Sequence, residues 1–482
     1  MSQEALSAKT LNRKAAKAGI FFVAVQILVR GLSFLLTPVY TRLVSKAQYG
    51  EIRVYESWLL ILVPLLSLAM YKSVARAKYD HPDDYEEYVA SVQGLSHLSV
   101  AAVFLVITLF FRKQFMDFMG LDWIMYIFMI LYCFAYSSTN YYQARERQLL
   151  RYKQSVILTA LMMFPASLLS VILLWLGNRW QKPEWLVDLR IIGFYLPQVA
   201  GGLCVALLMF KQGGFRIRKK YWKYALGFSL PLIPETLSIQ IMNQSDKIMV
   251  RKMVGGDPTG VFSLATTVSF IIWVIEDAVW AAWLPWLFEK LDRKEAADIE
   301  RPWTYISYGF AYFSWALVIL SPEIVKVLGG SRYEEAIYLV APMVTGTLFR
   351  FFSFSFTAMQ NYRKKTFYCG MGTVAAMLVN IVLNAVCIHF FGYQAAAYTT
   401  AFSYFVLLLV QGILEKKVCG MRCVTLWRVL LRSLVFWAVN ELTVLTYTGP
   451  TLLRWGIMLL VSILAFWKLW PGLNTIRKQL KK

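Results

Sequence analysis

The chain has 482 residues, of which 58% are hydrophobic and 16% are charged, and its formal net charge is +22. Its mean hydropathy of +0.51 lies far outside the range of soluble globular domains. Apolar stretches of about 20 residues recur along the whole chain, separated by polar blocks no longer than about 20 residues, which leaves no room for a soluble catalytic domain. We therefore expect an all-α integral membrane protein.

The apolar runs predict about fourteen transmembrane helices. Their expected ranges are 19–42, 51–72, 91–111, 122–143, 154–176, 189–210, 223–248, 259–285, 303–328, 335–360, 367–389, 394–414, 427–446 and 452–470. With a cytoplasmic N-terminus, the inside segments hold about 32 Lys and Arg residues and the outside segments about 12, so both termini are expected inside. The basic residues lie in short clusters between spans, which favours membrane orientation over nucleic-acid binding.

The first expected span carries an arginine, Arg30, near its middle. Gln26, Ser33 and Thr37 share its helical face, so this stripe is expected to line a polar interior. An arginine that snorkels from a lipid-facing helix is the alternative.

More polar residues follow in the first half of the chain. Arg53 and Glu56 lie near the outer start of the second span, and Lys72 and Arg76 near its inner end. The fourth span has a stripe of polar side chains at helical spacing, namely Tyr132, Tyr136, Asn140 and Gln143. These side chains either contact a substrate or form hydrogen bonds between helices.

A short internal repeat divides the chain. Residues 37–55 and 248–264 share a pattern: the end of an apolar span, one or two basic residues, a short turn, and a glycine near the start of the next span. The glycine is Gly50 in the first segment and Gly260 in the second. The offset of about 210 residues predicts two parallel six-helix bundles related by a pseudo-twofold axis. The expected domains are an N-terminal bundle at 1–212, a C-terminal bundle at 213–418, and two additional helices with a basic tail at 419–482.

The second half has two further polar groups. Arg350 begins a stripe in the tenth span, and an arginine suits an anionic substrate because its guanidinium stays charged and binds phosphate bidentately. Glu276 and Asp277 in the eighth span are candidate counter-ions or a proton relay. Asp246, Asn380, Asn384 and Thr400 offer the hard oxygen ligands of an alkali cation, with interhelical hydrogen bonding as the alternative.

Enzyme signatures are absent from the sequence. It shows no nucleophile and base pair and no phosphate-binding glycine loop. Cys419 and Cys423 share a basic loop, but a metal site there would need more ligands than lie nearby. We expect no enzyme activity and no cofactor, and energy is expected to come from a gradient of sodium or protons or from the substrate itself.

Three segments resemble the polysaccharide-flippase family, the Wzx-type O-antigen and exopolysaccharide translocases of the multidrug, oligosaccharidyl-lipid and polysaccharide exporter superfamily. They are LLTPVYTRLVSKAQYGEIRVYES, SVARAKYD and NQSDKIMVRKMVGGDPTGVFSLA. The resemblance implies a pair of six-helix bundles around a cationic cavity in the bacterial inner membrane. The implied cargo is an undecaprenyl-pyrophosphate-linked oligosaccharide, which is flipped to the outer leaflet by alternating access. The implied partners are membrane lipid and other polysaccharide-assembly membrane proteins, and no nucleic acid is expected.

Related lipid II flippases place arginines for the pyrophosphate in their first, second and eighth spans. Arg30 and Arg53 fall at corresponding places, and Arg350 is expected to replace the third. Those relatives also bind sodium between a seventh-span Asp, two eleventh-span residues four apart and a twelfth-span Thr. Asp246, Asn380, Asn384 and Thr400 fit this spacing.

Three other functions are alternatives to a flippase. A multidrug and toxic-compound extrusion protein moves organic cations, which the arginines would repel. A membrane polysaccharide polymerase or ligase would need a long outer loop with catalytic residues, and the expected outer loops are short. A scaffold would not need charges at mid-membrane depth.

Overall fold

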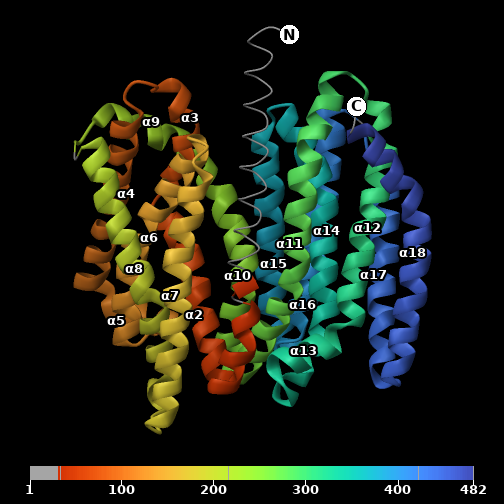
Figure 1. Ribbon diagram of the computed structural model, residues 1–482, viewed down its shortest axis with the longest axis horizontal. Helices are drawn as coiled ribbons and strands as arrows, with labels where there is room; N and C mark the ends of the chain where they lie inside the picture. The colour runs from red at the N-terminus through yellow and green to blue at the C-terminus, as the bar shows by residue number, and fades with distance from the viewer. Residues whose placement is uncertain (1–30, 33, 215, 422, 481–482) are drawn as a thin grey trace. The chain divides into compact units, whose positions relative to one another are not determined.

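The computed structural model describes residues 31–480 apart from 33, 215 and 422, and all regular structure within them is helical (Figure 1). Contacts divide the chain into two compact units, Met1–Gln244 and Ser245–Lys482. The expected first span lies largely outside the described residues, although helix is present at 34–43.

Unit 1 is built around helix α8. This helix packs against α4, α6 and α7, and α2 contacts both α6 and α8 (Figure 1). The helices of this unit are α2 (Lys46–Leu66), α3 (Val74–Asp80), α4 (Tyr85–Val106), α5 (Arg112–Met119), α6 (Trp123–Gln148), α7 (Tyr152–Arg179), α8 (Leu186–Gly213), α9 (Lys219–Ser229) and the first part of α10 (Ile233–Met253).

Local sequence sets both ends of α2. Ser45 and Gln48 form a reciprocal capping box at its start, which satisfies two backbone N–H groups that have no helical partner. Pro64 lies in its last turn, and the chain then passes through left-handed backbone at Leu68 and Ala69. The helical segment that follows, Met70–Asp80, is inclined by 57° to α2. This second span is therefore a bent one.

Unit 2 is built around helix α14, which packs against α11, α12, α16 and α17. Its apolar and aromatic sequence is almost fully enclosed, with Phe351, Phe352 and Phe356 completely buried. The helices of this unit are the last part of α10, then α11 (Gly256–Asp292), α12 (Glu300–Ile319), α13 (Ser321–Gly329), α14 (Ile337–Tyr362), α15 (Thr366–Phe391), α16 (Ala395–Leu414), α17 (Leu426–Val444) and α18 (Thr451–Leu480).

The helices make this a multi-pass membrane protein. Ten described helices are long and apolar enough to cross a membrane, and the number rises to twelve if each of two bent pairs is one span. A helix lies in every expected range from 51–72 onward. Helix α6 is not among the ten because its tyrosines and amides lower its hydropathy. The all-α membrane fold is confirmed, and the count of fourteen stays a prediction.

The boundary between the two units lies inside α10, whereas the expected domain boundary lies at 212/213. Helix α9 packs against α4, where the indole N–H of Trp222 donates to the Ser91 carbonyl at 3.0 Å. Residues 219–244 therefore group with unit 1 by contact. The domains inferred from the repeat stay a prediction about symmetry.

Candidate functional site

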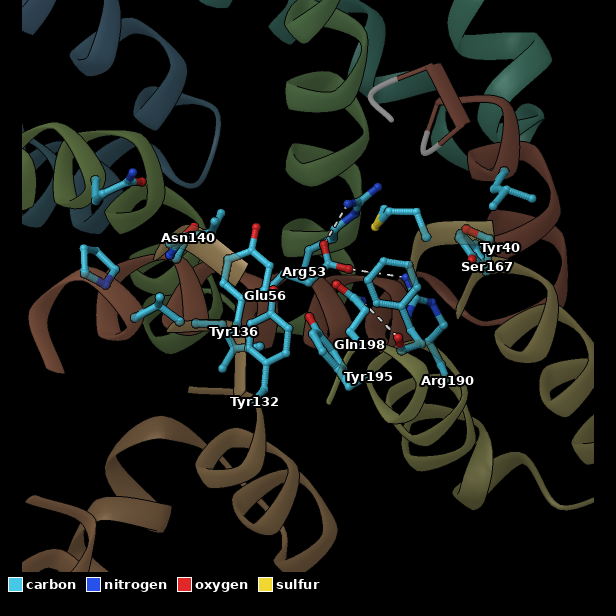
Figure 2. Close-up of a pocket in the computed structure, with 18 of the residues that line it drawn as sticks. Tyr40, Arg53, Glu56, Tyr132, Tyr136, Asn140, Ser167, Arg190, Tyr195 and Gln198 are labelled. Atoms are coloured by element: carbon cyan, nitrogen blue, oxygen red, sulfur yellow. Dashed lines mark hydrogen bonds and ion pairs between the residues drawn. The ribbon is translucent and has the colours of Figure 1, made fainter. Parts of the chain in front are cut away.

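Unit 1 contains a cavity of about 430 Å³ between α2, α6, α7, α8, α10 and the helix at 34–43 (Figure 2). Apolar side chains form part of its wall, and the polar remainder is unusually rich in arginine, tyrosine and amide groups. The polar lining consists of Tyr40, Arg53, Glu56, Tyr71, Tyr132, Tyr136, Asn140, Ser167, Arg190, Tyr195, Gln198, Thr236 and Gln240.

Arg53 is fixed by contacts within its own helix. The spacing of four and three residues in α2 places Tyr49, Arg53 and Glu56 on one face. The Tyr49 hydroxyl accepts hydrogen bonds from Arg53 Nε at 3.1 Å and Nη2 at 2.9 Å. Glu56 Oε2 accepts from Arg53 Nη1 at 2.8 Å. One face of α2 therefore presents a positioned guanidinium to the cavity.

Arg190 reaches the same carboxylate from the start of α8. Its Nη2 lies 3.4 Å from Glu56 Oε1, and its Nη1 is buried and has no hydrogen-bond partner among the described residues. Its guanidinium carbon lies 4.5 Å from the ring centre of Tyr40 and 4.1 Å from that of Phe194. Both rings favour the cation by cation–π attraction. The cavity thus holds two arginines around one glutamate.

Three tyrosines, Tyr132, Tyr136 and Tyr195, line the cavity beside Glu56 (Figure 2). Tyr132 and Tyr136, one turn apart in α6, stack with ring centres 4.8 Å apart, and Tyr195 meets Tyr132 edge to face at 4.8 Å. Asn140 and Gln198 add amide groups beside them. Aromatic faces with hydroxyls and amides at their edges can stack on sugar rings and form hydrogen bonds with sugar hydroxyls.

The structure brings only some of the predicted substrate-binding residues together. Arg53, Tyr136 and Asn140 line the cavity. Lys72 is outside the lining and donates to Thr236 at 2.5 Å, while Arg76 is exposed and pairs with Asp80 at 3.0 Å. Arg30 and Gln26 lie outside the described residues.

Arg350 belongs to unit 2, where it forms a buried ion pair with Glu276. Its guanidinium carbon lies 3.4 Å from the centre of the Trp273 ring, so the ring face covers the charge. Asp277, the neighbour of Glu276, is exposed. Of the two expected counter-ions, Glu276 forms an ion pair with Arg350.

The four residues expected to bind a cation converge within unit 2. Asp246 Oδ1 accepts from Asn384 Nδ2 at 2.6 Å, and Asp246 Oδ2 accepts from the Thr400 hydroxyl at 2.6 Å. Asn380 Nδ2 donates to Thr400 Oγ1 at 3.0 Å. Carboxylate, amide and hydroxyl oxygens from α10, α15 and α16 thus meet in a buried cluster, which we call the oxygen cluster.

Several residues of these sites were not anticipated as ligands. Arg190 escaped notice because it lies at the edge of an apolar run, where an arginine is typical of a membrane interface. Tyr195 lies within the same run and was not singled out. Thr399 donates to Asn384 Oδ1 and Ser245 donates to Asn380 Oδ1 at 3.1 Å, so both extend the oxygen cluster. Their proximity to Thr400 and Asp246 was the only signal in the sequence.

The family model described as polysaccharide biosynthesis protein matches residues 15–290. Comparison with curated protein sequences finds no match.

Among solved structures, the chain is similar to lipid II flippase MurJ in an inward closed conformation, with 15% identity, a TM-score of 0.63, and coverage of 96% of this chain and 100% of that one. An inward-facing multidrug resistance MATE family transporter of the MOP superfamily gives 13% identity, a TM-score of 0.63, and coverage of 84% and 99%. An outward-facing multidrug resistance MATE family transporter of the MOP superfamily gives 13% identity, a TM-score of 0.54, and coverage of 86% of this chain and 97% of that one. At these identities the similarity shows a shared fold.

Proposed function

Because the chain belongs to the polysaccharide biosynthesis protein family, we propose that it is a flippase that moves undecaprenyl-pyrophosphate-linked oligosaccharides from the inner to the outer leaflet of a bacterial inner membrane. Transport proceeds by alternating access and supports synthesis of O-antigen, capsule or exopolysaccharide. The observation that carries this proposal is the cavity of unit 1, in which arginines and tyrosines lie side by side.

The chemistry of the cavity matches the two halves of such a headgroup. A pyrophosphate carries about two negative charges and cannot cross the hydrocarbon core alone, because each charge there costs several kcal/mol. Arg53 and Arg190 supply the opposite charge, and the tyrosines and amides supply a surface for sugar. The polyprenyl tail needs no such surface, since it stays in lipid. The structural similarity to a protein named as a lipid II flippase supports the same class of cargo.

Substitution of Arg53 tests this function. We expect Arg53→Ala to abolish surface polysaccharide in cells that depend on the protein, with lipid-linked repeat units accumulating, at an unchanged protein level. Arg53→Lys should recover only part of the export, because an ammonium cannot reproduce bidentate binding. Arg179→Ala is the control, since this arginine is exposed at the end of α7. Normal export by Arg53→Ala would contradict the proposal.

The same assay tests Arg30, which is not among the described residues, and Arg350 of unit 2. Arg30→Ala and Arg350→Ala are expected to lose transport while the protein still inserts and folds. Folding is checked by the elution profile of the purified protein. If both variants export normally, neither arginine contacts the pyrophosphate.

Extrusion of an organic cation is the rival function. Loss of drug resistance without loss of glycan export in these variants would favour it.

We further propose that the oxygen cluster couples transport to sodium. Asp246 contributes a formal negative charge, and the amide and hydroxyl oxygens of Asn380, Asn384 and Thr400 are ligands that a hard cation prefers. The hydrogen bonds among these groups, at 2.6–3.0 Å, support this proposal because they show that the groups lie close together. Proton coupling through Glu276 and Asp277 is the competing possibility.

Thermal unfolding of the purified protein tests the coupling ion. Sodium should raise the unfolding temperature more than a large organic cation at equal ionic strength, because an ion at 100 times its dissociation constant stabilises by about 2.7 kcal/mol. Asp246→Asn should remove this difference, whereas Asp257→Asn, at the exposed start of α11, should keep it. An equal sodium effect in wild type and Asp246→Asn would leave the cluster as interhelical hydrogen bonding.

A further inference from the structure

Glu56 is the one acidic side chain in the described lining of the unit 1 cavity, and it lies between the two arginines. Its Oε2 accepts from Arg53 Nη1 at 2.8 Å, and its Oε1 lies 3.4 Å from Arg190 Nη2. Two guanidinium groups around one carboxylate leave positive charge in excess. The carboxylate therefore lies where an anionic ligand of both arginines would bind (Figure 2).

The two arginines are held to different degrees. Arg53 donates from Nε, Nη1 and Nη2, and the Tyr49 hydroxyl oxygen accepts two of these three hydrogen bonds. Among the described residues, Arg190 forms one hydrogen bond, the 3.4 Å contact with Glu56, and its Nη1 has no hydrogen-bond partner. Just 4% of Arg190 is exposed. A buried charged donor without an acceptor is unfavourable. An oxyanion that enters the cavity can satisfy this donor, while the rings of Tyr40 and Phe194 keep the guanidinium in place.

We propose that Glu56 is an internal competitor for the cargo, which an oxyanion of the headgroup displaces from Arg190 and Arg53. This inference rests on the proposed function and assigns Glu56 and Arg190 within it. The incoming oxyanion is a phosphate oxygen of the carrier or a carboxylate of an acidic sugar, since a guanidinium binds both in the same geometry. No covalent bond or proton transfer is involved, because one ion pair replaces another.

A competitor of this kind favours turnover over affinity. When the cargo is bound, Glu56 lies beside a second negative charge, and repulsion between the two weakens binding. When the cargo departs, the carboxylate re-forms its ion pairs with both arginines, so the vacated charges regain a partner. Without it, the cavity would hold its cargo more tightly and release it more slowly.

Glu56→Gln separates the effect of Glu56 on cargo affinity from its effect on turnover. Glutamine keeps the size of glutamate and an acceptor oxygen but lacks the charge. We expect the purified full-length variant to bind inorganic pyrophosphate about fivefold or more tightly than wild type in calorimetric titrations, in line with typical coupling between sites. Export in cells should slow at an equal protein level. A purely structural Glu56 would lose binding and export together. Glu51→Gln removes a charge from the same helix outside the cavity lining and serves as the control.

A second variant keeps the test decisive if Glu56→Gln fails to fold. Arg190→Lys retains the charge but removes the guanidinium fork, so its pyrophosphate affinity should fall about tenfold. Unchanged affinity in Arg190→Lys would overturn the assignment. Parallel titrations with glucuronate identify the source of the oxyanion. If the oxyanion belongs to an acidic sugar, Glu56→Gln should raise the affinity for glucuronate more than the affinity for pyrophosphate.

The outcomes distinguish this inference from the proposed function. If wild type exports glycan, Arg53→Ala does not, and Glu56→Gln binds neither anion more tightly, then the internal competitor is wrong and the flippase stands. If Arg53→Ala exports normally, the flippase assignment fails whatever Glu56→Gln does. Tighter binding with slower export in Glu56→Gln alone supports the competitor.

Discussion

At the residue scale, burial decides what an ion pair contributes. The Arg145 side chain is 5% exposed and donates to both carboxylate oxygens of Glu86 at 2.7 Å, with Glu146 fully buried beside it. The Arg76 side chain is 62% exposed in its pair with Asp80. Water screens the Arg76–Asp80 pair far more than the Arg145–Glu146 pair, in which the two side chains are 5% and 0% exposed, so the two pairs contribute differently to stability.

We expect Arg145→Ala to lower the free energy of unfolding by about 3 kcal/mol or more, because it leaves the Glu146 charge buried without its partner. Arg76→Ala should have a much smaller effect, because water screens the exposed pair that Arg76 forms with Asp80. Thermal or denaturant unfolding of the purified variants measures both. Equal effects of the two substitutions would show that burial does not set the contribution of these pairs.

Cys423 lies between two spans and is nearly enclosed, and burial raises the pKa of its thiol to about 11 from an ordinary value of 9.0. In a variant that keeps only this cysteine, alkylation at neutral pH should be about a hundredfold slower in the folded than in the unfolded protein, since thiolate is the reactive form. The folded state favours the neutral thiol, so its stabilising effect holds below pH 9 and declines as pH rises from 9 to 11. Equal alkylation rates in both states would contradict the burial.

Residue-scale chemistry was only partly readable from the sequence. Asn380 and Asn384 had to share a helical face because they are four apart. Their oxygen-ligand chemistry, and then the family resemblance, connected them with Asp246. The partner of Arg350 was open, since Glu276 lies 74 residues away and its neighbour Asp277 was equally eligible. Arg190 was missed because the sequence around a single arginine at the edge of an apolar run does not indicate whether its side chain faces the protein interior or the membrane surface.

At the element scale, close helix packing in unit 1 depends on glycines of α8. A Cβ on Gly202 would lie 2.5 Å from the carbonyl oxygen of Ala135 in α6, and one on Gly193 would lie 2.6 Å from Cα of Ser170 in α7. Backbone atoms cannot rotate away as a side chain can. These positions therefore fix how near the neighbouring helices come to α8, and with it the walls of the cavity.

Gly202→Ala should destabilise the protein by about 1–3 kcal/mol, the usual result of overpacking. Gly227→Ala in α9 is the matched control, because nothing lies within 4 Å of its added Cβ. There the better helix propensity of alanine should leave stability unchanged or raise it by up to about 1 kcal/mol. Unfolding temperatures measured under one detergent condition test the pair, and a harmless Gly202→Ala would exclude close packing of α6 on α8.

Elements were the most predictable feature because twenty-residue apolar runs leave few alternatives in a membrane. A helix was found in each expected range from 51–72 onward. The bends were not anticipated. Pro64 signals one in α2 and Pro322 signals one between α12 and α13, yet a 57° or 55° inclination depends on the packing around the break.

At the scale of the whole molecule, the family and the fold are established, while orientation depends on charge alone. The excess of Lys and Arg in alternate loops, about 32 against about 12, is the only feature that distinguishes the two faces. Acidic residues between Asp80 and Glu87 do not weaken this argument, since carboxylates contribute little to orientation. Several of them are also neutralised locally, as where Arg218 pairs with Glu87 at 2.7 Å.

The charge asymmetry predicts that both ends of the chain face the cytoplasm. A reporter that is active only in the cytoplasm should be active when fused after Lys482, and one that requires export should stay inactive there. Fusions in the short segment around Lys182, expected outside, should give the reverse pattern. Because both termini on one side require an even number of crossings, an extracytoplasmic signal after Lys482 with a cytoplasmic N-terminus would require an odd number and exclude fourteen spans.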